Sequence, residues 1–243
     1  MRIPRVHVET ELSAGAEIAL ADAQSHYLKH VLRLKPGAAL QLFNGHDGSE
    51  YRAVLVANGK RLRAQVEAKI ANDSDSDFDC TLLQGLGRSD HTDWIIQKAT
   101  ELGVSRIHLF HAQRSQSRLK SKQLEKKMQH WRGVAISACE QSGRNRLPPI
   151  HFIDDFDQAL SGGESGDKFL LDFDGESLAA SLNAGLDSIV LLIGPEGGFN
   201  SDEIEKARQA GFRPVTLGPR VLRTETAAIS AITIAQAIAG DMR

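Results

Sequence analysis

Little in this chain points to a secreted, membrane-bound or metal-binding protein. Its two cysteines, Cys80 and Cys139, are too few for a disulfide framework and lack the spacing of metal ligands. We expect both to be small apolar residues in a reducing compartment. No apolar run is long enough to cross a bilayer, and no signal-peptide pattern stands at the start. We therefore expect a cytoplasmic protein with neither a metal nor a membrane partner.

Two common phosphate-binding motifs are missing as well. The chain has neither the Gly-x-Gly-x-x-Gly pattern of dinucleotide sites nor the lysine of a P-loop. It does have two glycine- and proline-rich breaks, at 194–198 and 217–219, each between an apolar strand pattern and a helix. Parallel strands end at one edge of a sheet, where open α/β folds bind their ligands. The pattern predicts a small-molecule site held largely by main-chain groups.

Glu196 lies inside the first of these breaks. A carboxylate there would repel a phosphate, so the expected ligand is neutral or cationic and rich in hydrogen-bond donors, as a sulfonium nucleoside is. Glu196 could equally cap the following helix or accept hydrogen bonds from main-chain amides. The sequence leaves these roles open.

The rhythm of apolar residues divides the chain into two domains. Residues 1–71 carry short alternating runs separated by turn sequences, which predict a small β-barrel with one helix over 21–34. An acidic, polar segment, 72–78, is the expected linker. Residues 79–243 alternate strand and helix patterns. That alternation is typical of a parallel sheet with helices on both faces.

The expected elements of the second domain follow from their apolar periods. Asn200 with Glu203 is typical of a helix cap. The last helix is apolar nearly all round, so we expect it to be buried by its own domain or by a partner subunit. Trp94 and Trp131 lie on apolar stripes and are expected in the core. The expected strands are 80–86, 104–111, 150–153, 168–173 and 189–193, and the expected helices are 90–102, 121–139, 200–211 and 224–239.

Charge is distributed unevenly although the net charge is only −2. Residues 106–146 contain ten lysines and arginines but two acidic residues. A basic patch of that density favours a polyanionic partner such as nucleic acid, whereas a solvated helix face explains most charge runs. Lys122, Lys126 and Lys127 fall on an exposed helical face. Charge alone leaves both interpretations open.

At the two breaks the sequence resembles a known family. The segments 192–198 and 217–227 look like the signature of the RsmE family, knotted (SPOUT-type) methyltransferases that methylate N3 of a uridine in small-subunit ribosomal RNA. The sequence departs from the family pattern at 88–92, where the family tends to carry a lysine-rich segment and often a methionine. The likeness extends through 30–34, 42–45, 96–104, 114–115 and 139–144.

The resemblance implies an α/β fold in which a C-terminal trefoil-knotted, parallel-sheet (SPOUT) methyltransferase domain follows a small PUA-like RNA-binding β-barrel. It implies S-adenosylmethionine as the cofactor, a homodimer packed through the knot domain, and small-subunit ribosomal RNA in the assembled 30S particle as the partner. The residues expected to contact S-adenosylmethionine are Leu171, Asp172, Gly194, Pro195, Glu196, Gly197, Gly198, Leu217, Gly218, Leu222 and Thr226.

Methylation of uridine N3 requires that its proton leave before or during methyl transfer, because the protonated nitrogen is a poor nucleophile. A positioned base, or cations that stabilise the developing uracil anion, can meet that need. Arg223 and Arg114 are candidates for stabilising this charge or gripping a phosphate. Glu140 and Glu225 are candidate bases or orienting groups. The residues expected to contact RNA are Arg33, Lys122, Lys126, Lys127 and Arg144.

Two alternatives remain open at this point. One is another knotted RNA methyltransferase that acts on a different RNA or base. The other is a ribosome-binding factor that has lost catalysis, against which the intact glycine-rich breaks and the Arg223–Thr226 run argue.

Overall fold

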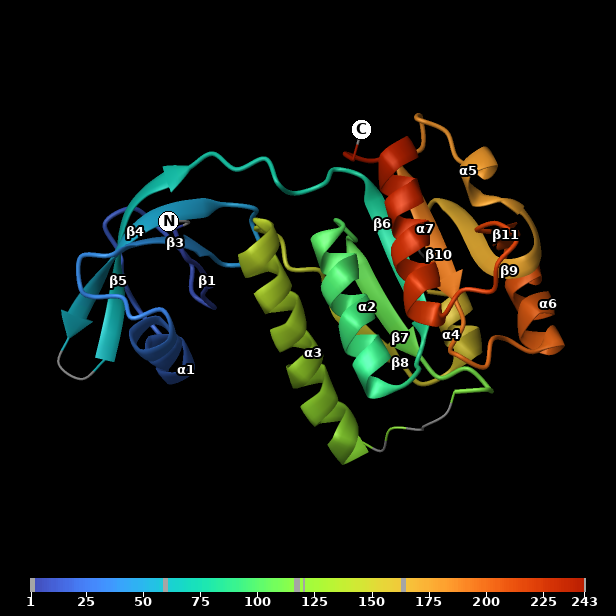
Figure 1. Ribbon diagram of the computed structural model, residues 1–243, viewed down its shortest axis with the longest axis horizontal. Helices are drawn as coiled ribbons and strands as arrows, with labels where there is room; N and C mark the ends of the chain where they lie inside the picture. The colour runs from blue at the N-terminus through green and yellow to red at the C-terminus, as the bar shows by residue number, and fades with distance from the viewer. Residues whose placement is uncertain (1–2, 59–60, 116–118, 120, 163–164, 243) are drawn as a thin grey trace. The chain divides into compact units, whose positions relative to one another are not determined.

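A computed structural model describes residues 3–58, 61–115, 119, 121–162 and 165–242 (Figure 1). The chain forms two compact units. Unit 1 comprises Met1–Asp75 and Cys139–Leu147, and unit 2 comprises Ser76–Ala138 and Pro148–Arg243. Unit 1 ends within the expected linker, 72–78. The grouping differs from the expected boundaries in that residues 139–147, which were expected in the C-terminal domain, join unit 1.

Unit 1 is built on a five-stranded sheet. Its strands are β1 (Arg5–His7), β2 (Glu17–Ala19), β3 (Ala39–Phe43), β4 (Glu50–Asn58) and β5 (Arg61–Ile70). They lie in the order β1-β3-β4-β5-β2, with β1 parallel to β3 and the other neighbours antiparallel. Alternate residues such as Leu40 and Leu42 point into one buried core, as the period of two in the sequence predicts.

The helical part of unit 1 is shorter than the expected range 21–34. Helix α1 (Asp22–His26) passes directly into a π-helical turn, η1 (Tyr27–Val31). Arg33 then takes a left-handed backbone conformation with a φ of 54°, which is uncommon outside glycine. Leu28 packs into the core, whereas Arg33 is exposed. The turn therefore presents Arg33 to solvent.

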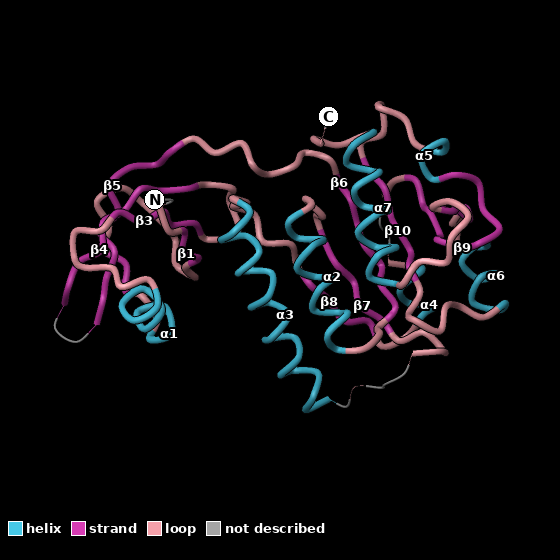
Figure 2. Tube along the Cα trace, viewed as in Figure 1, coloured by secondary structure: helices cyan, strands magenta, loops and turns pink. Residues whose placement is uncertain are grey.

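Unit 2 contains a six-stranded sheet in which all paired strands are parallel. Its strands are β6 (Asp79–Gly85), β7 (Arg106–Phe110), β8 (Ile150–Ile153), β9 (Asp167–Ser177), β10 (Ser188–Ile193) and β11 (Arg213–Thr216). The order is β11-β9-β10-β6-β7-β8, so β9 lies between the two strands that precede the glycine-rich breaks. Figure 2 shows how helices and strands alternate along this unit. All the strands end at one edge, where the breaks follow.

Helices pack on this sheet from two directions. Helices α4 (Phe156–Leu160) and α6 (Ser201–Gln209) form one core cluster with the alternate residues Val190 and Leu192 of β10. Helices α2 (Ser89–Glu101) and α7 (Thr224–Ile238) contact each other, and α7 packs on β10 (Figure 1). The remaining helices are α3 (Ser121–Ser142) and the short α5 (Leu178–Ser181). None of the described helices has the length and apolar character of a membrane span.

The burial of α7 and of the tryptophans bears on the predicted core. Ala231, Ile232 and Ala235 of α7 are buried within unit 2, as expected for this apolar helix. Trp131 is buried as expected, but the prediction that Trp94 lies in the core is wrong, because it is 50% exposed. The stripe that α2 buries is formed by neighbouring residues such as Ile95 and Ile96, and each step along a helix rotates the side chain by about 100°.

Both cysteines are free and buried. Burial raises the pKa of the Cys80 thiol to about 12 and that of the Cys139 thiol to about 11. Both thiols therefore stay protonated at neutral pH and behave as small apolar groups.

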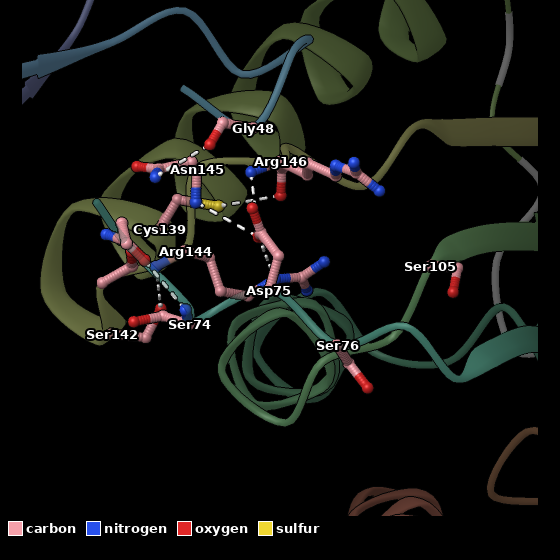
Figure 3. Close-up of polar contacts among 12 residues, drawn as sticks. Gly48, Ser74, Asp75, Ser76, Ser105, Cys139, Ser142, Arg144, Asn145 and Arg146 are labelled. Atoms are coloured by element: carbon pink, nitrogen blue, oxygen red, sulfur yellow. Dashed lines mark hydrogen bonds and ion pairs between the residues drawn. The ribbon is translucent and has the colours of Figure 1, made fainter. Parts of the chain in front are cut away.

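Residues 139–147 are attached to the rest of unit 1 by charged and polar contacts (Figure 3). Asp75 Oδ1 accepts hydrogen bonds from the backbone amides of Asn145 (3.2 Å) and Arg146 (3.0 Å), and it lies 3.6 Å from Arg144 Nε. Arg5 Nη2 donates to the carbonyl of Arg144 at 2.9 Å. Because Arg144 is buried, its positive charge depends on the Asp75 carboxylate.

Replacing Asp75 by Asn should destabilise unit 1. The substitution removes the negative charge that faces a buried guanidinium, so we expect a loss of roughly 2–3 kcal/mol in the free energy of unfolding. Chemical denaturation of the full chain measures it. Asp73→Asn is the matched control, because Asp73 is exposed in the same segment and should leave the midpoint unchanged. Equal midpoints for the two variants would contradict the assignment.

Candidate active site

A pocket of about 800 Å³ opens at the carboxyl edge of the unit 2 sheet. Its walls come from the middle of β9 (171–173), from the ends of β10 and β11 with the breaks that follow them, and from the starts of α2 and α7. The volume suits a ligand of nucleoside size, and the walls combine apolar side chains with a few converging polar groups. The two glycine-rich breaks of the sequence meet here.

The pocket gathers most of the residues expected to contact a ligand. Of the residues expected to contact S-adenosylmethionine, all except Gly218 and Thr226 line it. The candidates Arg114, Arg223 and Glu225 line it as well. The residues brought together from the expected cofactor set are Leu171, Asp172, Gly194, Pro195, Glu196, Gly197, Gly198, Leu217 and Leu222.

Hydrogen bonds join the first break to the start of α7 across the sheet edge. The Gly198 amide donates to the Pro195 carbonyl at 2.9 Å, and Gly198 closes this turn with a φ of +66°, where a side chain would be strained. Thr224 Oγ1 donates to the Gly194 carbonyl at 2.7 Å. The buried Gln84 Nε2 donates to that same carbonyl at 3.2 Å and to Thr224 Oγ1 at 3.1 Å. Sequence reasoning missed Gln84, although a glutamine ending an apolar strand at this edge was a usable signal.

The first break also packs tightly against the segment that follows β6. A Cβ atom on Gly87 would lie 2.5 Å from Glu196 Oε2, and one on Gly85 would lie 2.6 Å from Pro195 Cδ. At Gly85 the Cβ would also lie 2.8 Å from the backbone nitrogen of Pro195, so only glycine lets the two backbones approach this closely there, whereas at Gly87 the end of the Glu196 side chain would have to shift. Neither glycine was expected to belong to the site.

Glu196 is held by the opposite wall of the pocket. Its Oε1 accepts a hydrogen bond from the Arg88 amide at 2.9 Å and lies 2.9 Å from His91 Nδ1. Burial alone would raise the pKa of Glu196, but the hydrogen bonds from backbone amides and from His91, together with the His91 charge, lower the pKa below 4.5. Its contribution to folded stability is therefore present above about pH 4.5 and is lost as the pH falls through the lowered pKa.

The two arginine candidates occupy different walls. Arg114 Nη1 donates to the carbonyls of Gly197 (3.2 Å) and Phe199 (3.3 Å), so its side chain lies along the first break. Arg223 is the N-cap residue of α7 and is exposed. Helix α6 begins with the expected capping box of Asn200 and Glu203.

Glu140 and Arg144 lie outside this pocket, in unit 1. Glu140 Oε1 accepts a hydrogen bond from the His7 amide at 3.1 Å, and burial raises the pKa of Glu140. The Arg144 side chain is 6% exposed and faces Asp75, so the charge expected to contact RNA is directed at a carboxylate of the same unit.

The lysines expected to contact RNA have mixed exposure. Lys122 and Lys126 are exposed on α3, whereas Lys127 is half-buried and contacts Ser89 Oγ. Two more basic residues of the 106–146 segment, Arg118 and Lys120, lie outside the described residues. Within the part of the chain that is described, no group of three or more metal-ligating side chains occurs.

Comparison with known proteins identifies the family and the fold. The model of an RNA methyltransferase domain matches residues 74–236, and that of an RNA methyltransferase PUA domain matches residues 20–67. A "Ribosomal RNA small subunit methyltransferase E" from Buchnera aphidicola (subsp. Schizaphis graminum) is 34% identical over 99% of this chain and 98% of the relative. The chain belongs to the ribosomal RNA small subunit methyltransferase E family. This is the RsmE family that the two breaks predicted.

Solved structures of the family confirm the predicted fold. The Neisseria gonorrhoeae ribosomal RNA small subunit methyltransferase E, solved with S-adenosyl methionine bound, superimposes with a TM-score of 0.91 at 34% identity and covers 100% of both chains. A Legionella pneumophila protein solved with the bound cofactor SAM gives a TM-score of 0.94 at 32% identity, with 99% of this chain and 100% of that chain covered. The expected PUA-like unit and the parallel-sheet methyltransferase domain are both present.

Replacing Gly87 by Ala should displace Glu196 from the pocket wall. The added methyl group would meet the Glu196 carboxylate, the end of a flexible side chain, which must then turn away from the Arg88 amide and His91. We therefore expect a loss of about 0.5–1.5 kcal/mol in the free energy of unfolding, measured by chemical denaturation. Gly133→Ala on α3 is the control. A Cβ there meets no atom within 4 Å, and alanine in a helix should gain about 0.5–1 kcal/mol. A Gly87→Ala protein as stable as wild type would contradict the packing argument.

Proposed function

We propose that this protein transfers a methyl group from S-adenosylmethionine to N3 of a uridine in small-subunit ribosomal RNA. The observation that carries the proposal is the pocket at the carboxyl edge of the sheet, where both family motifs line one cavity. The Neisseria gonorrhoeae relative, which matches over the whole chain, was solved with S-adenosyl methionine bound. Shared motifs at the same edge support the same ligand here.

The residues of the pocket fit S-adenosylmethionine. Leu171, Leu217 and Leu222 offer apolar surface suited to an adenine ring, and Asp172 and Glu196 offer carboxylates suited to positively charged groups. Glu196 Oε1 is held by the Arg88 amide and by His91, which fixes this carboxylate at the pocket wall. When bound, S-adenosylmethionine supplies an electrophilic methyl group.

Three charged residues of the pocket are candidates for assisting the loss of the proton from uracil N3. Arg223 and Arg114 line the pocket and are exposed to it, and their guanidinium groups stay charged at any working pH. We propose that they stabilise the negative charge that develops when N3 loses its proton, or hold a neighbouring phosphate. Glu225, buried at the first turn of α7, is the proposed base or orienting group. Glu140, which supports β1 in unit 1, is not part of this proposal.

For the rest of the chain we propose the roles expected of the family. Residues 1–71 form the PUA-like RNA-binding domain, 72–78 the linker, and 79–243 the methyltransferase domain with a trefoil knot at its C-terminal end. The active form is a homodimer packed through the knot domain. Exposed Phe173 and Val221 at the pocket rim, 72% and 79% accessible, support a partner surface there. The substrate is the assembled 30S particle in the cytoplasm.

Methyl transfer from labelled S-adenosylmethionine to small ribosomal subunits that lack the modification tests the proposal. Digestion and mass spectrometry should find N3-methyluridine at a single site. Binding of S-adenosylmethionine without transfer to small subunits would favour a different RNA target. Neither binding nor transfer would indicate a ribosome-binding factor without catalysis.

Replacing Arg223 by Ala should slow the chemical step. If its charge stabilises the uracil anion, we expect kcat to fall by about 10²- to 10³-fold with a smaller effect on S-adenosylmethionine affinity. Single-turnover methyl transfer and calorimetry separate the two quantities. Arg208→Ala is the control, because Arg208 is exposed on α6 and does not line the pocket. A fall in affinity that accounts for the whole rate loss would assign Arg223 to cofactor binding.

Neutralising Lys122, Lys126 and Lys127 together to Gln should weaken the salt dependence of RNA binding. For every phosphate that the variant no longer neutralises, the slope of log K against log salt concentration falls by about 0.7–0.9. Lys206→Gln with Arg213→Gln is the control, since both cations are paired with carboxylates, Asp157 and Asp167. An unchanged slope in the triple variant would mean that this face of α3 is merely solvated.

A further inference from the structure

Two large apolar side chains of unit 1 are exposed on the turn η1. Tyr27 is 50% exposed and Val31 is 59% exposed, whereas Leu28 between them is buried in the core. The exposed rings of His26 and His30 lie beside each other on the same stretch, with 4.7 Å between their centroids. Single exposed apolar residues are common anywhere on a protein, but a cluster of apolar and aromatic groups is typical of an interaction site.

Three exposed cations accompany this cluster. They are Lys29, Arg33 and Lys35, and residues 26–35 contain no acidic side chain. None of the three forms an ion pair with a residue that the structure describes, in contrast to Arg63 of β5, whose Nη1 lies 3.0 Å from Glu17 Oε1. The positive charge of the turn is therefore uncompensated within unit 1, and a polyanion would complement it.

The backbone conformation of Arg33 indicates that its side chain is needed. Its φ is 54°, and every other described residue with a positive φ is a glycine. Glycine adopts this conformation readily, whereas a Cβ atom makes it less stable. An exposed arginine gains no burial from its position, so its contribution is the guanidinium that it presents to solvent. Strained residues of this kind occur preferentially at binding sites.

Backbone hydrogen bonds hold the two ends of this stretch together. The Leu32 amide donates to the Tyr27 carbonyl at 3.0 Å, and the Leu34 amide donates to the Leu28 carbonyl at 2.9 Å. The second bond spans Arg33, so the backbone on both sides of this residue is fixed. Tyr27 and Arg33 are thus attached to one ordered turn, and π-helical turns are frequent at functional sites.

An aromatic ring accompanied by uncompensated cations suits single-stranded RNA. Unpaired bases have free faces that stack on tyrosine and histidine rings, while lysine and arginine side chains hold the backbone phosphates. In an A-form duplex the bases stack on one another, so an exposed ring would find no free base face. The combination of ring and charge therefore favours an unpaired RNA segment over a duplex.

We propose that the η1 surface, formed by Tyr27, Lys29, Val31, Arg33 and Lys35, binds an unpaired segment of RNA, with one base stacked on Tyr27 and neighbouring phosphates held by the cations. The proposal rests on the proposed function only in naming small-subunit ribosomal RNA as the source of that segment. It gives this surface a role in holding the substrate and none in the transfer of the methyl group.

Fluorescence anisotropy with a labelled single-stranded RNA of about ten nucleotides tests the surface in the full chain. Tyr27→Ala should raise the Kd about 5- to 30-fold, because one base loses its stacking partner. Tyr27→Phe keeps the ring and should bind as wild type does. A duplex of the same length should bind more weakly, with the same Kd for all three proteins. Equal Kd values of Tyr27→Ala and wild type for the single strand, or stronger binding of the duplex, would overturn the proposal.

Arg33→Gly separates a binding role of Arg33 from a structural one. Glycine accepts the positive φ, so the variant should melt close to wild type. It should nevertheless bind the single strand more weakly, and the slope of log K against log salt concentration should fall by about 0.7. Arg63→Gln is the matched control, because Arg63 is paired with Glu17 and should leave the slope unchanged. An unchanged slope in Arg33→Gly would overturn the assignment of Arg33 to RNA.

Methyl transfer to small ribosomal subunits distinguishes a failure of this inference from a failure of the proposed function. Tyr27→Ala should raise the KM for small subunits and leave kcat and the calorimetric Kd of S-adenosylmethionine unchanged. If wild type transferred no methyl group, the proposed function would fail, and the anisotropy measurements would still decide the role of the η1 surface. If Tyr27→Ala matched wild type in both KM and kcat, this inference would be overturned and the methyltransferase function would stand.

Discussion

The close approach of the Gly194–Gly198 loop to the backbone at Gly85 is the constraint on which the site depends. Because Gly85 has no side chain, Pro195 lies against its backbone, and Glu196 reaches the Arg88 amide. Gln84, buried beneath them, satisfies the Gly194 carbonyl and Thr224 together. One wall of the pocket is therefore built by backbone contacts, which fix its shape before any ligand arrives.

Several charged side chains line this pocket. Two poorly exposed carboxylates share one imidazole, while several arginines around the same cavity are open to solvent. The paired carboxylates and the exposed arginines are suited to different roles. Charges that are paired within the protein hold the loops in place, and the proposed function gives the exposed arginines the role of stabilising an anion on the substrate.

In unit 1, too, some charged side chains are paired within the protein and others are exposed to solvent. Arg144 lies in a strongly basic stretch of sequence, but its guanidinium is buried against Asp75 and holds residues 139–147 to this unit. Glu140, from the same stretch, supports β1 through the His7 amide. Arg33, by contrast, is presented to solvent by a π-helical turn. Local charge density alone does not tell these cases apart, because burial is decided by partners distant in sequence.

The elements of the fold, and the edge at which the site lies, could be predicted from the residues alone. Apolar periods of two and 3.6 indicated the strands and helices, the Asn200–Glu203 pair marked the start of α6, and the glycine-rich breaks marked the pocket. These signals are local. The three-dimensional arrangement was needed to show that Trp94 is exposed, that Arg144 is buried, and that His91 faces Glu196 and Glu225. Each depends on contacts between residues far apart in the chain, and no periodicity of a single segment encodes such contacts.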